Sequence, residues 1–209
     1  TYGEDDPELT YTATGAKNGE TPVFEGALAR ATGENADNYT INKGTLALKD
    51  GEGFRASNYA LVFSDTEVKF TISKATYGDK TASGSAMYGN TGTVDLSGLI
   101  AEGGSMVVNN SQSKDDDRVL DSWKVDDEIR SLSFGFVDDA SKVGKTAKIV
   151  ILVRSANYKD YTITVTLTVN DKLTPVLDGA LTLTPAEITY GDALSKITIT
   201  GTMKDPTTG

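Results

Sequence analysis

The side chains that could do chemistry in this 209-residue chain are carboxylates, lysines, tyrosines and hydroxyls, because histidine and cysteine are both absent. Without histidine there is no Ser-His-Asp or Cys-His catalysis, no His-ligated zinc and no proton shuttle near neutral pH. Without cysteine there are no disulfides or thiol nucleophiles. Carboxylate pairs for glycosidase chemistry are available in number, but none is set in a cleft-forming pattern. We therefore expect no enzyme and predict no catalytic, cofactor-binding or metal-ligating residue.

Two acidic stretches could supply oxygen ligands to calcium. One is a run of three aspartates at residues 115–117, and the other is GEDDPE at residues 3–8. A calcium site needs about six to eight converging oxygens, whereas consecutive side chains point in different directions and the EF-hand spacing is absent. We interpret the first stretch as a solvated loop. We interpret the second as an entry turn stiffened by Pro7, with calcium between adjacent units as the alternative.

Trp123 is the single tryptophan and could stack on a sugar if it lay on a surface loop. A lone tryptophan in a β domain more often packs in the core or at its edge, and we predict that position. The glycine-bearing turns GEGF, GNTG and AEGG lack the lysine and the strand–loop–helix context of a phosphate cradle. We interpret these turns as loops.

A covalent bond between a lysine amine and an Asn or Asp side chain could replace the missing disulfides. Such a bond needs a buried lysine, because burial lowers the pKa of the amine and only the neutral amine attacks a carbonyl. Lys148 lies in the apolar run AKIVILV, and Asn157 and Asp160 lie in the connection that follows it. Strand alternation favours an outward Lys148, so the pattern favours no crosslink.

The chain is acidic, with thirty Asp and Glu against twenty Lys and Arg and a formal net charge of −10. Such a surface repels phosphate backbones and anionic lipid, so we expect no nucleic acid and no membrane among its partners. No apolar run approaches the ~18–20 residues of a membrane span. We interpret the charge as a source of solubility for a monomer, and the chain as an internal segment of a longer protein whose targeting segments lie outside it.

The elements that position these residues are β-strands. Residues 161–169, YTITVTLTV, alternate apolar side chains with threonine, which predicts a half-buried strand with one hydroxyl face. Its partner is predicted at residues 146–155, a more continuous apolar run joined to it by a hairpin connection. Further strands of this part are predicted at residues 93–97, 105–108 and 131–137.

The first part of the chain predicts further short strands separated by Gly, Asn and Asp turns. They lie at residues 9–14, 38–41, 44–48, 58–63 and 68–73. Residues 25–33 fit a strand or a short helix equally well, and residues 125–132 could form one helical turn at most. The predicted fold is mainly β, with tandem small domains of a β-grasp-like or Ig-like sandwich type and little helix.

One four-residue word marks the organisation of the chain. TYGD occurs at residues 76–79 and 189–192, and TYGE opens the chain. We expect its tyrosine to pack at a core edge, its glycine to allow a tight bend and its acidic residue to face solvent. Because each word lies near the opening of a unit, we predict domains at 1–75 and 76–172, and a linker with the truncated start of a further repeat at 173–209.

The stretches of the first unit occur in a characteristic order: TYGEDDPELTYTATG, FEGALARATGENADNYTINKGTL, NYALVF and FTISKA. Together they resemble the YGX-type MBG repeat of bacterial extracellular proteins over residues 1 to about 75. At Ala36 and Asp37 the family often has Val-Gly, so the turn there departs from the family pattern. The matching positions are Tyr2, Gly3, Asp6, Pro7, Leu9, Gly26, Arg30, Gly33, Glu34, Asn38, Tyr39, Ile41, Gly44, Asn58 and Tyr59.

The second unit, through TVDLSGLI and SANYKDYTITVTLTVNDK, is similar to Ig-like repeats of Gram-positive surface proteins, and residues 188–209 resemble the opening of another repeat. These resemblances imply surface-exposed tandem repeats of adhesin-like proteins, without an active site or cofactor. We therefore expect a non-enzymatic spacer or stalk, located extracellularly at the cell surface or cell wall, whose partners are neighbouring repeats of the same chain. The alternative is an adhesin module that binds a host glycan or protein.

Overall fold

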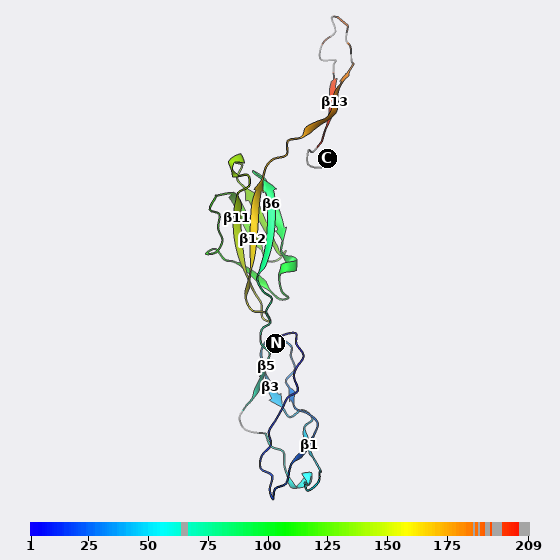
Figure 1. The fold of residues 1–209 in the computed structure, drawn as a ribbon, viewed down its shortest axis with the longest axis vertical. Helices are drawn as coiled ribbons and strands as arrows, with labels where there is room; N and C mark the ends of the chain where they lie inside the picture. The colour runs from blue at the N-terminus through cyan, green and yellow to red at the C-terminus, as the bar shows by residue number, and fades with distance from the viewer. Residues whose placement is uncertain (64–66, 186, 188, 191–192, 194–197, 205–209) are drawn as a thin grey trace.

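The computed structural model describes residues 1–63, 67–185, 187, 189–190, 193 and 198–204. Within them the fold is mainly β, as predicted, with several small sheets and only short 3₁₀ turns besides. Figure 1 shows three groups of strands following one another along one long axis. We call residues 1–75, 76–172 and 173–209 the first, second and third units.

The first unit contains two small antiparallel sheets, one pairing β1 with β4 and one in the order β2-β3-β5. Its buried apolar side chains, among the described residues, are Leu46, Phe54 and Ile72. This core is small for a unit of its length. The elements are β1 (Val23–Glu25), β2 (Ala29–Arg30), β3 (Asn38–Asn42), β4 (Ala47–Lys49), η1 (Ala56–Asn58) and β5 (Lys69–Thr71).

The second unit has two sheets, in the orders β6-β12-β11-β8 and β7-β10-β9, which share one buried core. The predicted strand at residues 161–169 is confirmed, since its alternate residues from Tyr161 to Val169 are at most 4% exposed. The elements are β6 (Lys80–Met87), β7 (Thr91–Asp95), η2 (Ser97–Leu99), β8 (Ser105–Val108), β9 (Leu120–Asp126), β10 (Ser131–Phe136), η3 (Ala140–Lys142), β11 (Thr146–Arg154) and β12 (Tyr161–Asn170).

The two larger units differ in where the chain enters and leaves. In the second unit the first strand, β6, pairs in parallel with the last strand, β12. Parallel neighbours begin at the same end, so the chain enters this unit at one end and leaves at the other. In the first unit the N–H of Tyr2 donates to the carbonyl of Ser73 at 2.8 Å. Its entry and exit therefore lie together, beside the second unit (Figure 1).

The third unit contributes a two-stranded antiparallel ribbon of β13 (Val176–Thr184) and β14 (Thr198–Lys204). The third TYG word lies between these two strands in the chain. A strand precedes it because the run VLDGALTLT alternates apolar and small polar residues and pairs with β14. Gly191 and Asp192 of this word lie outside the described residues.

Several predicted elements of the first unit are wrong or shorter than predicted. The strands predicted at residues 9–14 and 58–63 are absent, because no neighbouring segment pairs with their backbone in the described part of the chain. Residues 10–14 and 59–63 line a cavity instead. Residues 25–33 are neither one strand nor a helix. Gly26 breaks them at φ +76°, and a Cβ there would lie 2.2 Å from the carbonyl oxygen of Thr45.

The region predicted to hold one helical turn, residues 125–132, is the tight connection of the β9–β10 hairpin. The Asp126 carboxylate accepts hydrogen bonds from the backbone N–H groups of Glu128 (3.1 Å) and Ile129 (3.3 Å). Arg130 then takes a left-handed conformation, with φ +53°. The aspartate thus stabilises a turn in place of a helix start, which is the competing role of this residue type.

Candidate functional site at the junction between units

The glycines of the first two TYG words are required by backbone conformation. Gly3 has φ +81° and Gly78 has φ +78°, in the left-handed region that other residues adopt at a cost. A Cβ at either position would meet no atom within 4 Å, so space is not the constraint. Each glycine turns the chain directly after a tyrosine.

The two turns bring Tyr2 and Tyr77 onto one side chain, Tyr158, in the connection between β11 and β12. Tyr2 lies edge-on to Tyr158 with ring centroids 5.4 Å apart, and Tyr77 lies edge-on to it at 5.5 Å. Tyr77 also contacts Tyr161 of β12 at 5.1 Å. Edge-to-face pairs of this kind add about 0.5–1.5 kcal/mol each beyond the area they bury. The tyrosines of the first two words therefore both pack on the second unit.

Tyr161 anchors this aromatic chain to the core. Its hydroxyl donates to the carbonyl of Leu99 at 2.9 Å and accepts from the N–H of Ala101 at 2.8 Å. Burial raises the pKa of the Tyr161 phenol above its ordinary value, although the hydrogen bond from Ala101 opposes the shift. Tyr161 therefore stays neutral and serves as a fixed platform for Tyr77.

Asn157, next to Tyr158 in the second unit, forms hydrogen bonds to the first unit. Its side-chain oxygen accepts from the N–H of Ala36 at 2.9 Å, and its amide donates to the side-chain oxygen of Asn35 at 3.0 Å. Its backbone carbonyl accepts from the N–H of Ala75 at 2.9 Å. One residue therefore holds both a loop of the first unit and the segment that joins the units.

The joining segment is paired with the second unit along its backbone. Ala75 bridges Tyr158 in parallel, because its carbonyl also accepts from the N–H of Lys159 at 2.8 Å. The ammonium of Lys74 donates to the carbonyl of Ser155 at 2.8 Å. A segment fixed by backbone pairing behaves as part of a sheet, in contrast to a flexible linker.

The acidic residue differs between the first two words. Asp79 is exposed, as predicted, but its carboxylate accepts from the backbone N–H of Thr162 at 2.7 Å and from the Thr162 hydroxyl at 3.0 Å. These two bonds, led by the backbone one, lower the pKa of Asp79. Glu4 is exposed and has no hydrogen bond or ion pair to the second unit among the described residues.

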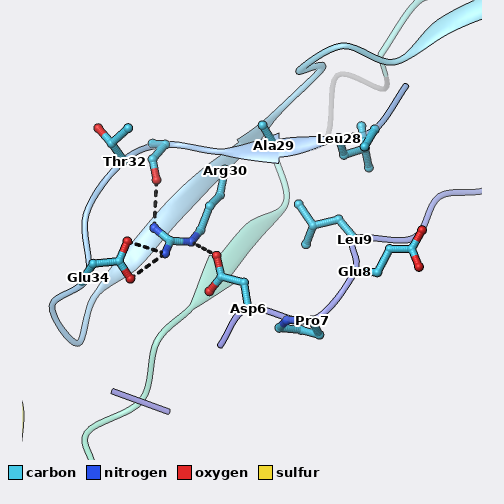
Figure 2. Close-up of a pocket in the computed structure, with 11 residues that line it drawn as sticks. Asp6, Pro7, Glu8, Leu9, Leu28, Ala29, Arg30, Thr32 and Glu34 are labelled. Carbon is cyan, nitrogen blue, oxygen red and sulfur yellow. Dashed lines mark hydrogen bonds and ion pairs between the residues drawn. The ribbon is translucent and has the colours of Figure 1, made fainter. Parts of the chain in front are cut away.

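A small pocket of about 420 Å³ in the first unit gathers several charged groups around Arg30 (Figure 2). Arg30 Nε donates to Asp6 at 2.6 Å, and Nη2 donates to both oxygens of Glu34 at 3.1 Å. Nη1 donates to the carbonyls of Ala31 and Gly33. Every guanidinium nitrogen is thus engaged by the protein itself.

Arg30 also packs its guanidinium over two rings, Tyr39 at 4.8 Å and Phe70 at 5.5 Å from the centroids. The hydrogen bond from Asp6 is the largest cause of the raised pKa of Arg30. Because two carboxylates, two carbonyls and two rings surround this cation, it is not free to bind an anionic substrate. The cluster fastens the entry turn at residues 3–8 to the sheet.

The aspartate run at residues 115–117 is a surface loop with a structural role. Asp115 accepts from the N–H groups of Val119 (2.7 Å) and Leu120 (3.0 Å), which sets the start of β9. Asp117 lies 3.8 Å from the ammonium of Lys145. The carboxylates therefore face different partners, and no group of three or more potential metal ligands converges among the described residues.

The residues considered for a crosslink do not meet. Lys148 is exposed on β11 and is paired in register with Thr166, far along the strands from the connection that holds Asn157. Asp160 forms an ion pair with Arg154 at 3.5 Å. Lys148 is exposed, so it lacks the burial that the reaction needs.

Trp123 lies at the core edge, as predicted, since it is half-buried against the core opposite Phe134. Its ring is therefore a packing group. A cavity of about 860 Å³ lies in the first unit and is lined mainly by apolar and aromatic side chains. Sequence reasoning did not single out this cavity, nor the junction roles of Asn157 and Tyr158, although their loop carries a tyrosine between polar turn residues.

Comparison with known families finds one match. Residues 1–71 match the family described as MBG domain (YGX type), which confirms the predicted MBG repeat in the first unit. This family is a structural repeat of extracellular bacterial proteins, not a known enzyme family. The match stops before the second unit, whose Ig-like assignment stays a prediction. No curated protein and no solved structure matches the chain. Within the described residues, no helix is long and apolar enough to cross a membrane.

Proposed function

We propose that this chain is a non-enzymatic spacer segment of a bacterial cell-surface protein, in which neighbouring β units are joined by fixed junctions. The observation that carries the proposal is the junction at Asn157 and Tyr158. These two residues contact the first unit through hydrogen bonds and a ring pair, and they pair with the backbone of the joining segment. A spacer must hold its units apart at a set orientation. A flexible linker would make no such set of contacts.

The proposal includes the unit boundaries 1–75, 76–172 and 173–209, and it is supported by sheets whose strands each come from one unit. It also includes an extracellular location at the cell surface or wall, supported by the MBG match in the first unit. The partners of each unit are the neighbouring repeats of the same chain, and the segment acts as a monomer. Its acidic charge of −10 disfavours association with like surfaces.

A distance measurement between the first two units tests the fixed junction. Because the chain has no native cysteine, Lys17→Cys and Lys124→Cys place one spin label on each unit at exposed positions. We expect a single narrow distance distribution that broadens in Asn157→Ala/Tyr158→Ala. The matched control is Asn109→Ala, in a loop of the second unit away from the junction, which should leave the width unchanged. A distribution already broad in the parent chain would refute the spacer.

A second candidate function is binding of a glycan or host protein by the first unit. The observation that favours it is the cavity of about 860 Å³, whose lining includes Tyr11, Phe24 and Phe63. Tyr11 is 44% exposed and lies edge-on to Phe24, so its ring is available for stacking on a sugar. A glycan array probed with the parent chain and with Tyr11→Ala tests this. Glycan signals that the parent chain gives and Tyr11→Ala loses support binding at this cavity. An array on which the parent chain gives no signal refutes this second function.

A further inference from the structure

If the chain is a spacer, any load on it runs through the second unit from entry to exit, so this inference rests on the proposed function. The entry strand β6 and the exit strand β12 lie side by side and parallel, in register from Lys80 opposite Ile163 to Met87 opposite Asn170. Pulling the two ends apart slides one strand along the other. Parallel ladder bonds are evenly spaced, so such shear loads them together, whereas peeling would load them one at a time.

Both ends of this strand pair carry additional ties. At the entry end, Asp79 accepts two hydrogen bonds from Thr162. At the exit end, the N–H of Tyr88 donates to the carbonyl of Asn170 at 3.1 Å. Just beyond it, Lys172 donates to Asp138 at 2.9 Å and lies over the Tyr88 ring at 4.2 Å. These contacts extend the ladder past both of its ends.

Side-chain packing adds a second barrier to sliding. The buried face of β12 is fully covered, and β6 lies so close to the core that a Cβ on Gly84 would come within 2.5 Å of Val94 and 3.1 Å of Leu167. A slip of one residue would turn every inward side chain of β6 outward. The strands therefore cannot slide stepwise without first opening the core.

The first unit has the opposite geometry. Its ends meet at the hydrogen bond between Tyr2 and Ser73, so a load applied to them opens that contact first and peels the unit. Its strands are two to five residues long. We propose that the second unit is the mechanically strong element of the segment, with β6 and β12 as a shear clamp, and that the first unit is the element that yields first.

Single-molecule force measurements on the full chain test the clamp through two attachment geometries. Handles on Thr76→Cys and Thr174→Cys shear β6 against β12. Handles on Lys145→Cys and Thr174→Cys unzip β12 from β11, because Val169 and Lys145 are neighbours at that end. At one constant force we expect the second unit to unfold at least ~10-fold faster when unzipped, a barrier lower by about 1.4 kcal/mol. Equal rates would overturn the clamp.

A point variant separates the clamp from overall stability. Asp79→Ala removes the acceptor for Thr162, and we expect it to speed unfolding several-fold under shear while leaving the unzipping rate unchanged. Asp121→Ala, at an exposed position of β9, is the matched control and should change neither rate. If Asp79→Ala accelerates both geometries equally, its effect is on general stability and the clamp is rejected.

Solution scattering of the same chains distinguishes failure of the clamp from failure of the spacer. An elongated particle with equal unfolding rates in the two geometries rejects the clamp alone. A compact particle whose unfolding rates still differ between the two geometries rejects the spacer. The clamp would then be present, but the second unit would not hold its neighbours apart.

Discussion

Substitution of Phe54 by alanine tests whether the first unit folds as an energetically separate body. Phe54 is 1% exposed, is one of the few buried apolar side chains of this unit, and stacks on Tyr59 with centroids 5.1 Å apart. Truncation of a buried phenylalanine costs about 3–5 kcal/mol. A unit of this length has a total stability on the order of 4–10 kcal/mol. Phe54→Ala should therefore remove most of the stability of the first unit.

The single tryptophan makes the assay specific, because Trp123 lies in the second unit and reports on that unit alone. In urea, circular dichroism of the parent should show both units unfolding, and tryptophan fluorescence only the second. Phe54→Ala should abolish the part of the dichroism change that belongs to the first unit. It should leave the fluorescence midpoint of the second unit close to its original value. Val62→Ala, at a position 79% exposed, is the control and should change neither signal.

A fluorescence midpoint that falls in Phe54→Ala by as much as the dichroism midpoint would refute the reasoning. It would mean that the junction couples the two units into one cooperative body. The contacts that tie the folded part of the first unit to the second are two hydrogen bonds of Asn157 and the Tyr2–Tyr158 ring pair, each worth about 1 kcal/mol. They are therefore expected to raise the fluorescence midpoint slightly, and no more than that.

Three further outcomes follow from the second unit and are measured by tryptophan-detected unfolding. Gly78→Ala should destabilise by about 1–2 kcal/mol, because a Cβ is strained at φ +78°, whereas Gly98→Ala, at an ordinary φ with open space, should be close to neutral. Hydrogen bonds lower the pKa of Asp79 and Asp139 in the folded protein below 3.8, the value in the unfolded chain. The two carboxylates therefore stabilise the fold above pH 3.8, and this stabilisation is lost as pH falls through their lower folded pKa values. The urea midpoint should therefore decline below about pH 4. Leu167→Ala, at 0% exposure, should cost about 2–5 kcal/mol.

The sequence predicts the second unit well where burial and pairing leave a periodic trace. β12 alternates strictly because one face meets the core and the other meets solvent, and β8 coincides with its predicted residues. β6 was missed because KTASGSAM holds small residues in place of large apolar ones. These side chains are small because β6 lies close against the core. That closeness depends on residues far away in the sequence, so the local pattern does not reveal it.

The first unit shows where local pattern is insufficient. Residues 9–14 alternate like a strand and residues 58–63 contain a continuous apolar run. A strand also needs a partner, and the chain supplies none to either segment within the described residues. The junction could not be predicted for a related reason. Asn157 and Tyr158 read as ordinary turn residues, and their roles depend on loops far away in the sequence. The Arg30 cluster likewise joins positions whose pairing the sequence does not reveal.

The repeated word is explained by what its residues share and by what they do not. Tyr2 and Tyr77 both pack on Tyr158, and Gly3 and Gly78 both turn the chain in the left-handed region. The acidic residue is not tied to this function, because Asp79 fixes the start of β12 while the exposed Glu4 has no hydrogen bond to the second unit among the described residues. The tyrosine and the glycine therefore form the joint. Since a joint needs a surface to receive it, the fully exposed Tyr190 of the third word forms no such joint within the described residues.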